Sequence, residues 1–155
     1  MKATGFLCDA ATVRDGLLHV LGGGVTRTFS PEYPAPLGVV FASILEFEQA
    51  TDPPGAYQVV VRVLSEDGKE QFLAASGEIR IDYVETPDSS LPGLVPFVVG
   101  LSNTELPRPG HYRVLVLVNG DEVWACTFGA YRGTIGDHES LGLRPTTPTA
   151  PVRSE

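Results

Sequence analysis

One hairpin signal limits what this chain can fold into more than any other feature of its sequence. Asn119 and Gly120 stand between two runs of alternating apolar residues, 112–118 (YRVLVLV) and 122–128 (EVWACTF). An Asn-Gly pair in this position is the strongest short-range indication of an antiparallel β-hairpin, because both residues tolerate the positive φ of a type I′ turn. The run before the turn predicts a set of core-facing side chains, which are Tyr112, Val114, Val116 and Val118.

The rest of the chain carries strand patterns and almost no helix patterns. No stretch of eleven or more residues keeps an apolar face at helical spacing without a Gly, a Pro or a β-branched cluster. Turn signals recur at roughly the 8–12-residue spacing of sandwiches and barrels. The predicted strands cover 2–8, 17–21, 38–48, 56–65, 71–84, 94–101, 112–118 and 122–128. We therefore expect an all-β fold, a single antiparallel β-sandwich of about eight strands that is immunoglobulin-like or C2-like.

Local signals predict how some of these strands are placed. Asp15-Gly16 is a tight-turn dipeptide, so strands 2–8 and 17–21 should form a hairpin around it. The glycines at 22–24 predict a bulge or a sharp bend, because glycine alone permits positive φ or close approach of another backbone at no steric cost.

The strand at 94–101 contains Pro96, which cannot donate a ladder hydrogen bond. This residue predicts an edge or bulge position for that strand. Outward positions such as Val60 and Leu115 are apolar, so the alternation between faces is incomplete. We expect loops or a partner to cover part of the outer surface.

The chain length predicts a single domain with a tail. With 155 residues, 43% of them hydrophobic, the chain can bury most of its apolar surface in one core. We assign residues 1–141 to a β-sandwich domain. Residues 142–155 (GLRPTTPTAPVRSE) contain three prolines and no large apolar residue after Leu143. Such a segment buries too little surface to fold, so we expect a disordered Pro/Thr-rich C-terminal tail.

Charge and cysteine usage exclude some partners and compartments. The 19 acidic and 11 basic residues give a net charge of −8. This charge repels phosphate backbones and anionic lipids, so neither nucleic acid nor a membrane is an expected partner. The N-terminal residues lack the apolar stretch of a secretory signal, which predicts a cytoplasmic protein with Cys8 and Cys126 reduced. The excess of Arg over Lys, together with abundant Ala, Gly, Pro and Val, indicates a GC-rich bacterial or phage source.

No residue pattern indicates catalysis or a cofactor. Neither cysteine nor any histidine has a neighbour at zinc-ligand spacing. No Ser or Cys stands in a nucleophile motif. The glycines at 22–24 lead into the strand-like residues 25–29 (VTRTF) rather than into a helix, which disfavours a phosphate-binding loop. We expect no enzymatic activity and no cofactor.

The acidic residues predict one candidate ligand site. If successive strands alternate in direction, the loops at one end of the sandwich are 9–15, 49–55, 83–93 and 119–121. Six acidic residues in these loops face a single basic one, Arg14, which gives that end a charge of −5. Because Ca²⁺ takes its oxygen ligands from flexible loops, we expect the candidate metal ligands to be Asp9, Asp15, Asp52 and Asp88. Aspartate also forms turns without a metal, and this remains the alternative interpretation.

Two parts of the sequence resemble a known family. Residues 6–11 (FLCDAA) and 15–24 (DGLLHVLGGG) resemble the opening of a family of small uncharacterised bacterial proteins known only as a domain of unknown function. The Pro-Gly-x-Tyr-x-Val run at 109–114 and the hairpin after it are similar too, so the resemblance covers roughly residues 1–130. It implies a β-sandwich with a tyrosine at a sheet corner. It implies no activity, catalytic residue or partner.

The expected function is a non-enzymatic module for protein binding or assembly. One β-sandwich would present its loops or a sheet face to a protein partner or to another copy of itself, as the apolar outward positions suggest. The alternative is a calcium-dependent binding module that uses the acidic loop end. A calcium titration separates the two, because a ligand that binds only the folded state raises the melting temperature.

Overall fold

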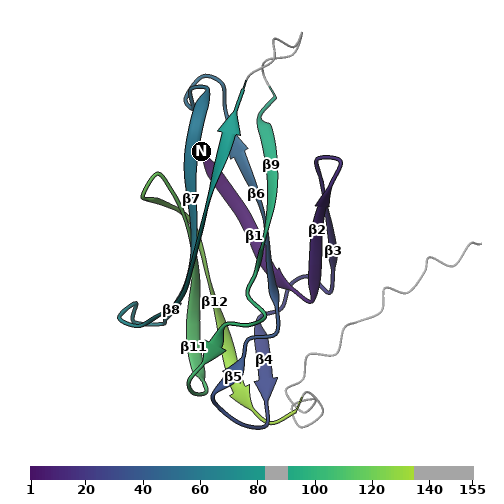
Figure 1. Ribbon diagram of the computed structural model, residues 1–155, viewed down its shortest axis with the longest axis vertical. Helices are drawn as coiled ribbons and strands as arrows, with labels where there is room; N and C mark the ends of the chain where they lie inside the picture. The colour runs from purple at the N-terminus through teal and green to yellow at the C-terminus, as the bar shows by residue number, and fades with distance from the viewer. Residues whose placement is uncertain (83–90, 135–155) are drawn as a thin grey trace, which may run out of the picture.

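The computed structural model describes residues 1–82 and 91–134, and these residues form strands and turns without a helix (Figure 1). Alternating apolar residues and turn dipeptides account for this content of strands and turns, as the sequence predicts. The strands are β1 (Lys2–Cys8), β2 (Ala10–Arg14), β3 (Leu17–Leu21), β4 (Arg27–Ser30), β5 (Ala35–Pro36), β6 (Val40–Phe47), β7 (Gly55–Ser65), β8 (Gln71–Ile81), β9 (Gly93–Gly100), β10 (Glu105–Leu106), β11 (Gly110–Val118) and β12 (Asp121–Arg132).

The strands belong to several sheets rather than to one simple sandwich. A five-stranded sheet has the order β4-β12-β11-β7-β8, and a three-stranded sheet has the order β1-β6-β9. The pairs β2-β3 and β5-β10 form two small sheets. The all-β expectation is confirmed. The expectation of a single antiparallel sandwich of about eight strands is not, because β4 pairs with β12 in parallel and the short strands form sheets of their own.

The hydrophobic core draws its side chains from the five-stranded and three-stranded sheets. Side chains alternate between the two faces of β11, and the inward set is the predicted one. Its members are all buried, and they are Tyr112, Val114, Val116 and Val118. The turn after β11 has φ values of 51° at Asn119 and 94° at Gly120, as the Asn-Gly signal predicts. Phe41 of the three-stranded sheet contacts Phe97 edge-on with ring centroids 6.0 Å apart. The inward face of β11 and the turn after it therefore follow the sequence pattern.

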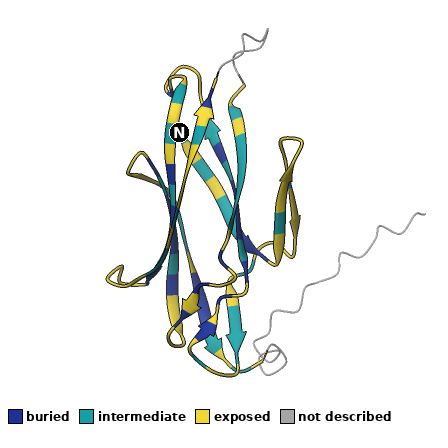
Figure 2. Cartoon of the chain, in the orientation of Figure 1, coloured by how far each residue is buried: buried dark blue, intermediate teal, exposed yellow. Residues whose placement is uncertain are grey.

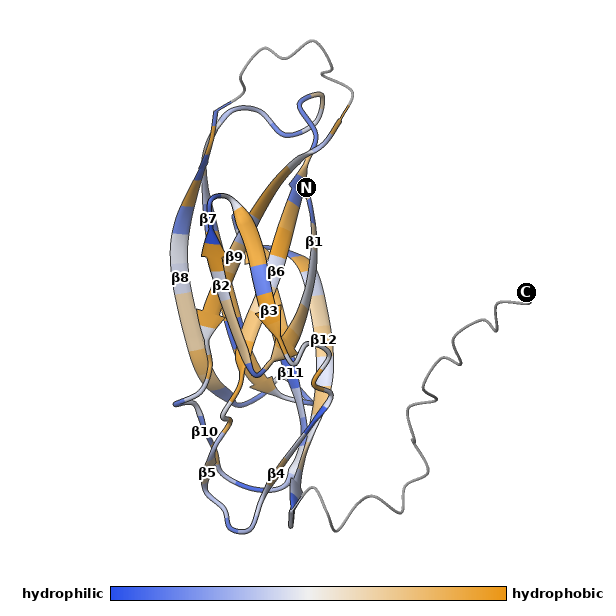
Figure 3. Cartoon of the chain, turned by 90° about the vertical axis from the view of Figure 1, so that its right-hand side faces the viewer, coloured by the Kyte–Doolittle hydropathy of each residue, from blue (hydrophilic) through white to orange (hydrophobic). Residues whose placement is uncertain are grey.

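The outer face of the three-stranded sheet is also covered. Phe41, Ala42 and Ser43 are consecutive residues of β6, and each is 0% exposed. Since neighbouring residues of a strand point to opposite faces, both faces of β6 must be covered. The hairpin β2-β3 supplies the outer cover, in front of β6 and β9 in Figure 3. Figure 2 shows most residues of that hairpin as exposed. This covered face belongs to the three-stranded sheet, whereas the apolar outward positions Val60 and Leu115 lie in β7 and β11 of the five-stranded sheet.

The pairing of the N-terminal strands differs from the prediction. Residues 2–8 pair with β6, not with residues 17–21. Asp15 and Gly16, with φ values of 52° and 74°, form a two-residue turn that joins Arg14 directly to Leu17. The strand before such a turn must consist of the residues immediately before it, so the predicted loop at 9–15 is largely strand β2.

Several smaller predictions have clear outcomes. Pro96 lies in β9, an edge strand, as predicted. Gly22 and Gly24 have φ values of 63° and 90°, which confirms a bend at 22–24. Cys8 and Cys126 are free thiols. No helix within residues 1–82 and 91–134 has the length and apolarity to cross a bilayer. The predicted tail at 142–155 lies outside the described residues.

Candidate functional site

The main candidate site is the groove where the two large sheets end side by side. The five-stranded sheet ends at β8 and the three-stranded sheet ends at β9, and these two edges are not paired with each other. A groove of about 430 Å³ lies between them. Side chains that form it include Val59, Val61, Ile79, Phe97 and Val99. We call this feature the β8–β9 groove.

Small residues in the middle of β8 keep the β8–β9 groove open. Gly77 pairs with Val59, and Ala75 pairs with Val61. Directly paired residues point to the same face of a sheet, and both valines face the core, so Ala75 and Gly77 do too. A Cβ built on Gly77 would meet no atom within 4 Å. The space that larger side chains would fill therefore remains open.

The backbone of β8 is the second component of the groove. Strand β8 has eleven residues, and the outermost position in its sheet leaves alternate N–H and C=O groups without a ladder partner. Natural edge strands usually carry proline, charged side chains or a bulge that prevents further pairing. From Leu73 to Ile81, β8 has no proline and pairs with β7 in regular register, and its two charged residues, Glu78 and Arg80, lie on the outer face. This stretch can accept another extended strand.

The chemistry of the β8–β9 groove is that of binding. Its lining is aliphatic and aromatic, and Glu78 is the one ionisable residue among the described residues that form it. Pockets of this kind hold ligands by apolar contact, with a few polar groups that fix orientation. Here the polar groups are the backbone amides and carbonyls of an open strand edge.

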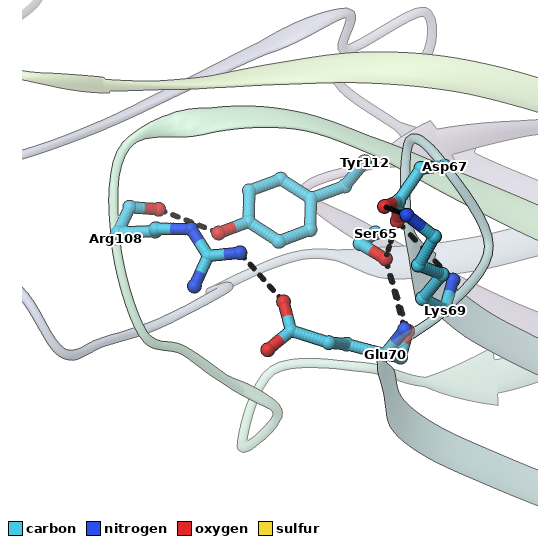
Figure 4. A network of polar contacts seen from close by, with 6 residues as sticks. All are labelled: Ser65, Asp67, Lys69, Glu70, Arg108 and Tyr112. Carbon is cyan, nitrogen blue, oxygen red and sulfur yellow. Dashed lines mark hydrogen bonds and ion pairs between the residues drawn. The ribbon is translucent and has the colours of Figure 1, made fainter.

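A second feature, at another end of the molecule, is a polar network around Arg108 (Figure 4). The Arg108 guanidinium lies 2.6 Å from a carboxylate oxygen of Glu70, and the Tyr112 hydroxyl donates to the Arg108 carbonyl. The Ser65 hydroxyl donates to Asp67 over 2.6 Å and accepts from the Glu70 amide over 3.0 Å. These bonds connect the β7–β8 turn to the loop before β11.

The pKa of Asp67 reflects the hydrogen bonds that this network donates to its carboxylate. The hydrogen bond from the Ser65 hydroxyl, followed by that from the Lys69 backbone amide, lowers the pKa of Asp67 to about 2. The groups of the network satisfy one another. The bond from the Tyr112 hydroxyl to the carbonyl of Arg108, four residues earlier, ties the loop before β11 to the start of that strand. We therefore interpret the network as an anchor for the turn.

A pocket of about 450 Å³ lies beside this network and is lined partly by Glu66 and His111. His111 Nδ1 lies 3.6 Å from Glu66 Oε2, and His111 Nε2 lies 3.4 Å from the Tyr131 hydroxyl. About half of each ion-pair side chain is exposed, and exposed pairs of this kind contribute roughly 0–1 kcal/mol. These contacts are long, and they form part of the exposed surface.

Of the predicted calcium ligands, Asp52 has the most defined surroundings. It is only 8% exposed, and one carboxylate oxygen lies 2.9 Å from the N-terminal amine of Met1. The other oxygen accepts a hydrogen bond from the Glu48 amide over 2.9 Å. Burial raises the pKa of Asp52, but the Glu48 amide and the Met1 amine outweigh burial, so the pKa is lowered overall. Both oxygens of Asp52 are thus engaged within the protein.

The structure does not bring the three described calcium-ligand candidates, Asp9, Asp15 and Asp52, together. Asp9 directly follows the last residue of β1, whereas Asp52 binds Met1, which directly precedes the first residue of β1. The length of β1 therefore separates Asp9 from Asp52 by about 20 Å. Asp9 and Asp15 lie at opposite ends of β2. Asp88 lies outside the described residues. Within residues 1–82 and 91–134, no group of three or more histidine, cysteine or acidic residues is placed to hold a metal ion.

Sequence reasoning missed the residues of the β8–β9 groove. The signal that could have found them is the run of small residues at 74–77 (AASG) within a predicted strand. Glycine inside a strand often marks a place where another backbone approaches closely. The partner wall from β9 could not be found this way, because it depends on which sheet edges meet.

Comparisons with known proteins give one family and distant likenesses among solved structures. A family model described as a family of unknown function, DUF6941, matches residues 3–130. A comparison with curated proteins gives no match. Among solved structures, Pseudomonas fluorescens alkylpurine DNA glycosylase AlkC bound to DNA containing an abasic site analog aligns with a TM-score of 0.36 and 18% identity. That alignment covers 70% of this chain and 28% of the glycosylase chain.

Proposed function

This chain belongs to DUF6941, a family of unknown function, and from that premise we propose that it is a non-enzymatic module of immunoglobulin-like or C2-like type that binds a protein partner. The partner would supply an extended segment that enters the β8–β9 groove and pairs with β8. The observation that carries this proposal is the open, regular edge of β8 beside an apolar groove.

The geometry suits strand addition because it offers two kinds of contact. Main-chain hydrogen bonds to β8 would each contribute about 0.5–1.5 kcal/mol. Alternate side chains of the added strand would point into the groove over Val59 and Val61. Burying one aliphatic side chain there would add roughly 1.5–3 kcal/mol. In this binding mode the backbone supplies affinity and the groove supplies sequence preference.

The charge of the chain favours a protein segment that is neutral or basic. The net charge of −8 opposes nucleic acid and anionic lipid surfaces. Glu78 adds a carboxylate beside the groove. Acidic segments should therefore bind more weakly than neutral or basic ones. The proposal also places the partner in the bacterial cytoplasm.

The test uses peptides of about ten residues selected from a random library on the full chain, with affinity then measured by calorimetry. Gly77→Val should fill the groove and weaken the selected peptides by about tenfold or more. Ala74→Val is the matched control, because it places the same valine side chain in the same strand but on the exposed outer face. Equal loss with both variants, no loss with Gly77→Val, or a library without binders would overturn the proposal.

A further inference from the structure

The hairpin β2-β3 presents an apolar surface that nothing in the described molecule covers. Leu17 is 64% exposed and Leu21 is 70% exposed. They are four residues apart in β3, so both point away from the sheet that the hairpin covers. Figure 3 shows β3 as mostly hydrophobic with a single hydrophilic interruption, and this corresponds to His19 between apolar neighbours.

The sequence of β3 is nearly the same in both directions around His19. Residues 17–21 read LLHVL. In an antiparallel pair of two β3 strands centred on His19, Leu17 lies opposite Leu21 of the other copy. Leu18 then lies opposite Val20. In a contact across a two-fold axis, the same surface of both copies must fit against itself. The near-symmetric order of side chains in β3 meets this requirement.

The backbone of β3 has the correct parity for this pairing. Because the turn has two residues, Arg14 and Leu17 on either side of it form a backbone hydrogen-bonded pair. Such pairs recur at every second residue of an antiparallel ladder, so His19 forms one with Thr12. Leu18 and Val20 therefore direct their N–H and C=O groups to the open edge. These are the two residues that face each other in the two-fold arrangement, and each can exchange both of its backbone hydrogen bonds.

Charge also favours a second copy at this edge. The chain has a net charge of −8, so most of its surface repels another copy. The ten strand residues of the hairpin include one charged residue, Arg14, next to the turn. Approach of two copies through β3 thus meets little repulsion.

We propose that two copies of this chain associate through their β3 edges, with a two-fold axis at His19, to form one antiparallel sheet from β2, β3 and their counterparts. This interface is separate from the β8–β9 groove, which lies between the other sheet edges. In the dimer, Leu17 of each copy lies beside Leu21 of the other on the outer face of the sheet, and this contact shields part of both side chains. A two-stranded hairpin is marginal by itself, and the added strands stabilise it.

The first experiment measures sedimentation of the full chain over a concentration series. The wild-type protein should form dimers, and His19→Glu should raise the dimer dissociation constant by about tenfold or more, because it places two carboxylates directly opposite each other. His19 is exposed, so the fold of the monomer should be unchanged by circular dichroism. A wild-type monomer at high concentration, or an unaffected His19→Glu dimer, would overturn the proposal.

Two variants, each with one introduced cysteine, test the geometry of the β3 interface independently. Opposite residues at a non-hydrogen-bonded antiparallel position have Cα atoms about 4.5 Å apart, which a disulfide can span. His19→Cys should therefore give a covalent dimer under mild oxidation. Thr12→Cys lies on the same face but in β2, so it should cross-link much more slowly. Equal cross-linking of the two variants would contradict the β3 interface.

Discussion

Gly77 of β8 lies directly opposite Val59 of β7, and a side-chain carbon built on Gly77 would meet no atom within 4 Å. This relationship explains why the two large sheets leave a groove at one side. A larger residue at this position would extend the wall of the core toward β9. The groove is thus a consequence of small side chains at the two core-facing positions of β8, Ala75 and Gly77.

Gly77→Val should leave the free energy of unfolding unchanged or raise it by about 0.5–1 kcal/mol, because glycine weakens a strand interior. Gly77 has ordinary extended backbone, so a β-branched residue fits without strain. Chemical denaturation measures this change. A loss of more than about 1 kcal/mol would show that the space beside Gly77 is not open.

Gly120→Val should lower the free energy of unfolding by about 1 kcal/mol or more. The φ of 94° at Gly120 is strained for a β-branched residue. Gly77→Val provides the matched comparison, since it makes the same substitution at extended backbone. The same denaturation midpoint for Gly120→Val and the parent would contradict the turn geometry.

Asp52→Asn should lower stability by about 1–2 kcal/mol at neutral pH, because charge-assisted hydrogen bonds are lost. The folded-state pKa of Asp52 is lowered, so its contribution is present above the unfolded pKa and disappears as the pH falls through the folded pKa. The difference from wild type should therefore shrink in acid. A calcium-type cluster of carboxylates would give the opposite sign, because mutual repulsion makes Asn stabilising there. Thermal unfolding between neutral and acidic pH distinguishes these signs.

Thr104→Val should raise stability by about 1 kcal/mol. The Thr104 hydroxyl is buried and has no hydrogen-bond partner among residues 1–82 and 91–134, and an unpaired buried polar group is unfavourable. Valine has nearly the same shape without the hydroxyl. Thr104→Ser keeps the hydroxyl and should not give this gain. An equal or lower melting temperature for Thr104→Val would show that the hydroxyl is satisfied.

Local signals in the sequence were sufficient for some elements and not for others. The Asn119-Gly120 hairpin was predictable because a two-residue turn and its flanking strands are encoded within a short window. The Asp15-Gly16 turn was equally predictable, but its first strand was misassigned. Residues 2–8 pair with β6 across more than thirty positions of sequence, and no local signal specifies such a partner.

The candidate sites depended even more on long-range arrangement. The predicted aspartate cluster assumed that successive strands alternate in direction around one sandwich, and the separate hairpin β2-β3 breaks that order. The β8–β9 groove requires two sheet edges to meet. The parallel pairing of β4 with β12 likewise joins residues far apart in the chain. Residue type and spacing alone could place none of these.

Amide hydrogen exchange of β8 with a selected peptide bound tests the central claim most directly. Strand addition predicts that exchange slows at alternate residues between Leu73 and Ile81, because their outward N–H groups gain partners. Gly77→Val should abolish this protection at the same peptide concentration. Unchanged exchange along β8, with peptide bound and protection confined to other strands, would contradict the account.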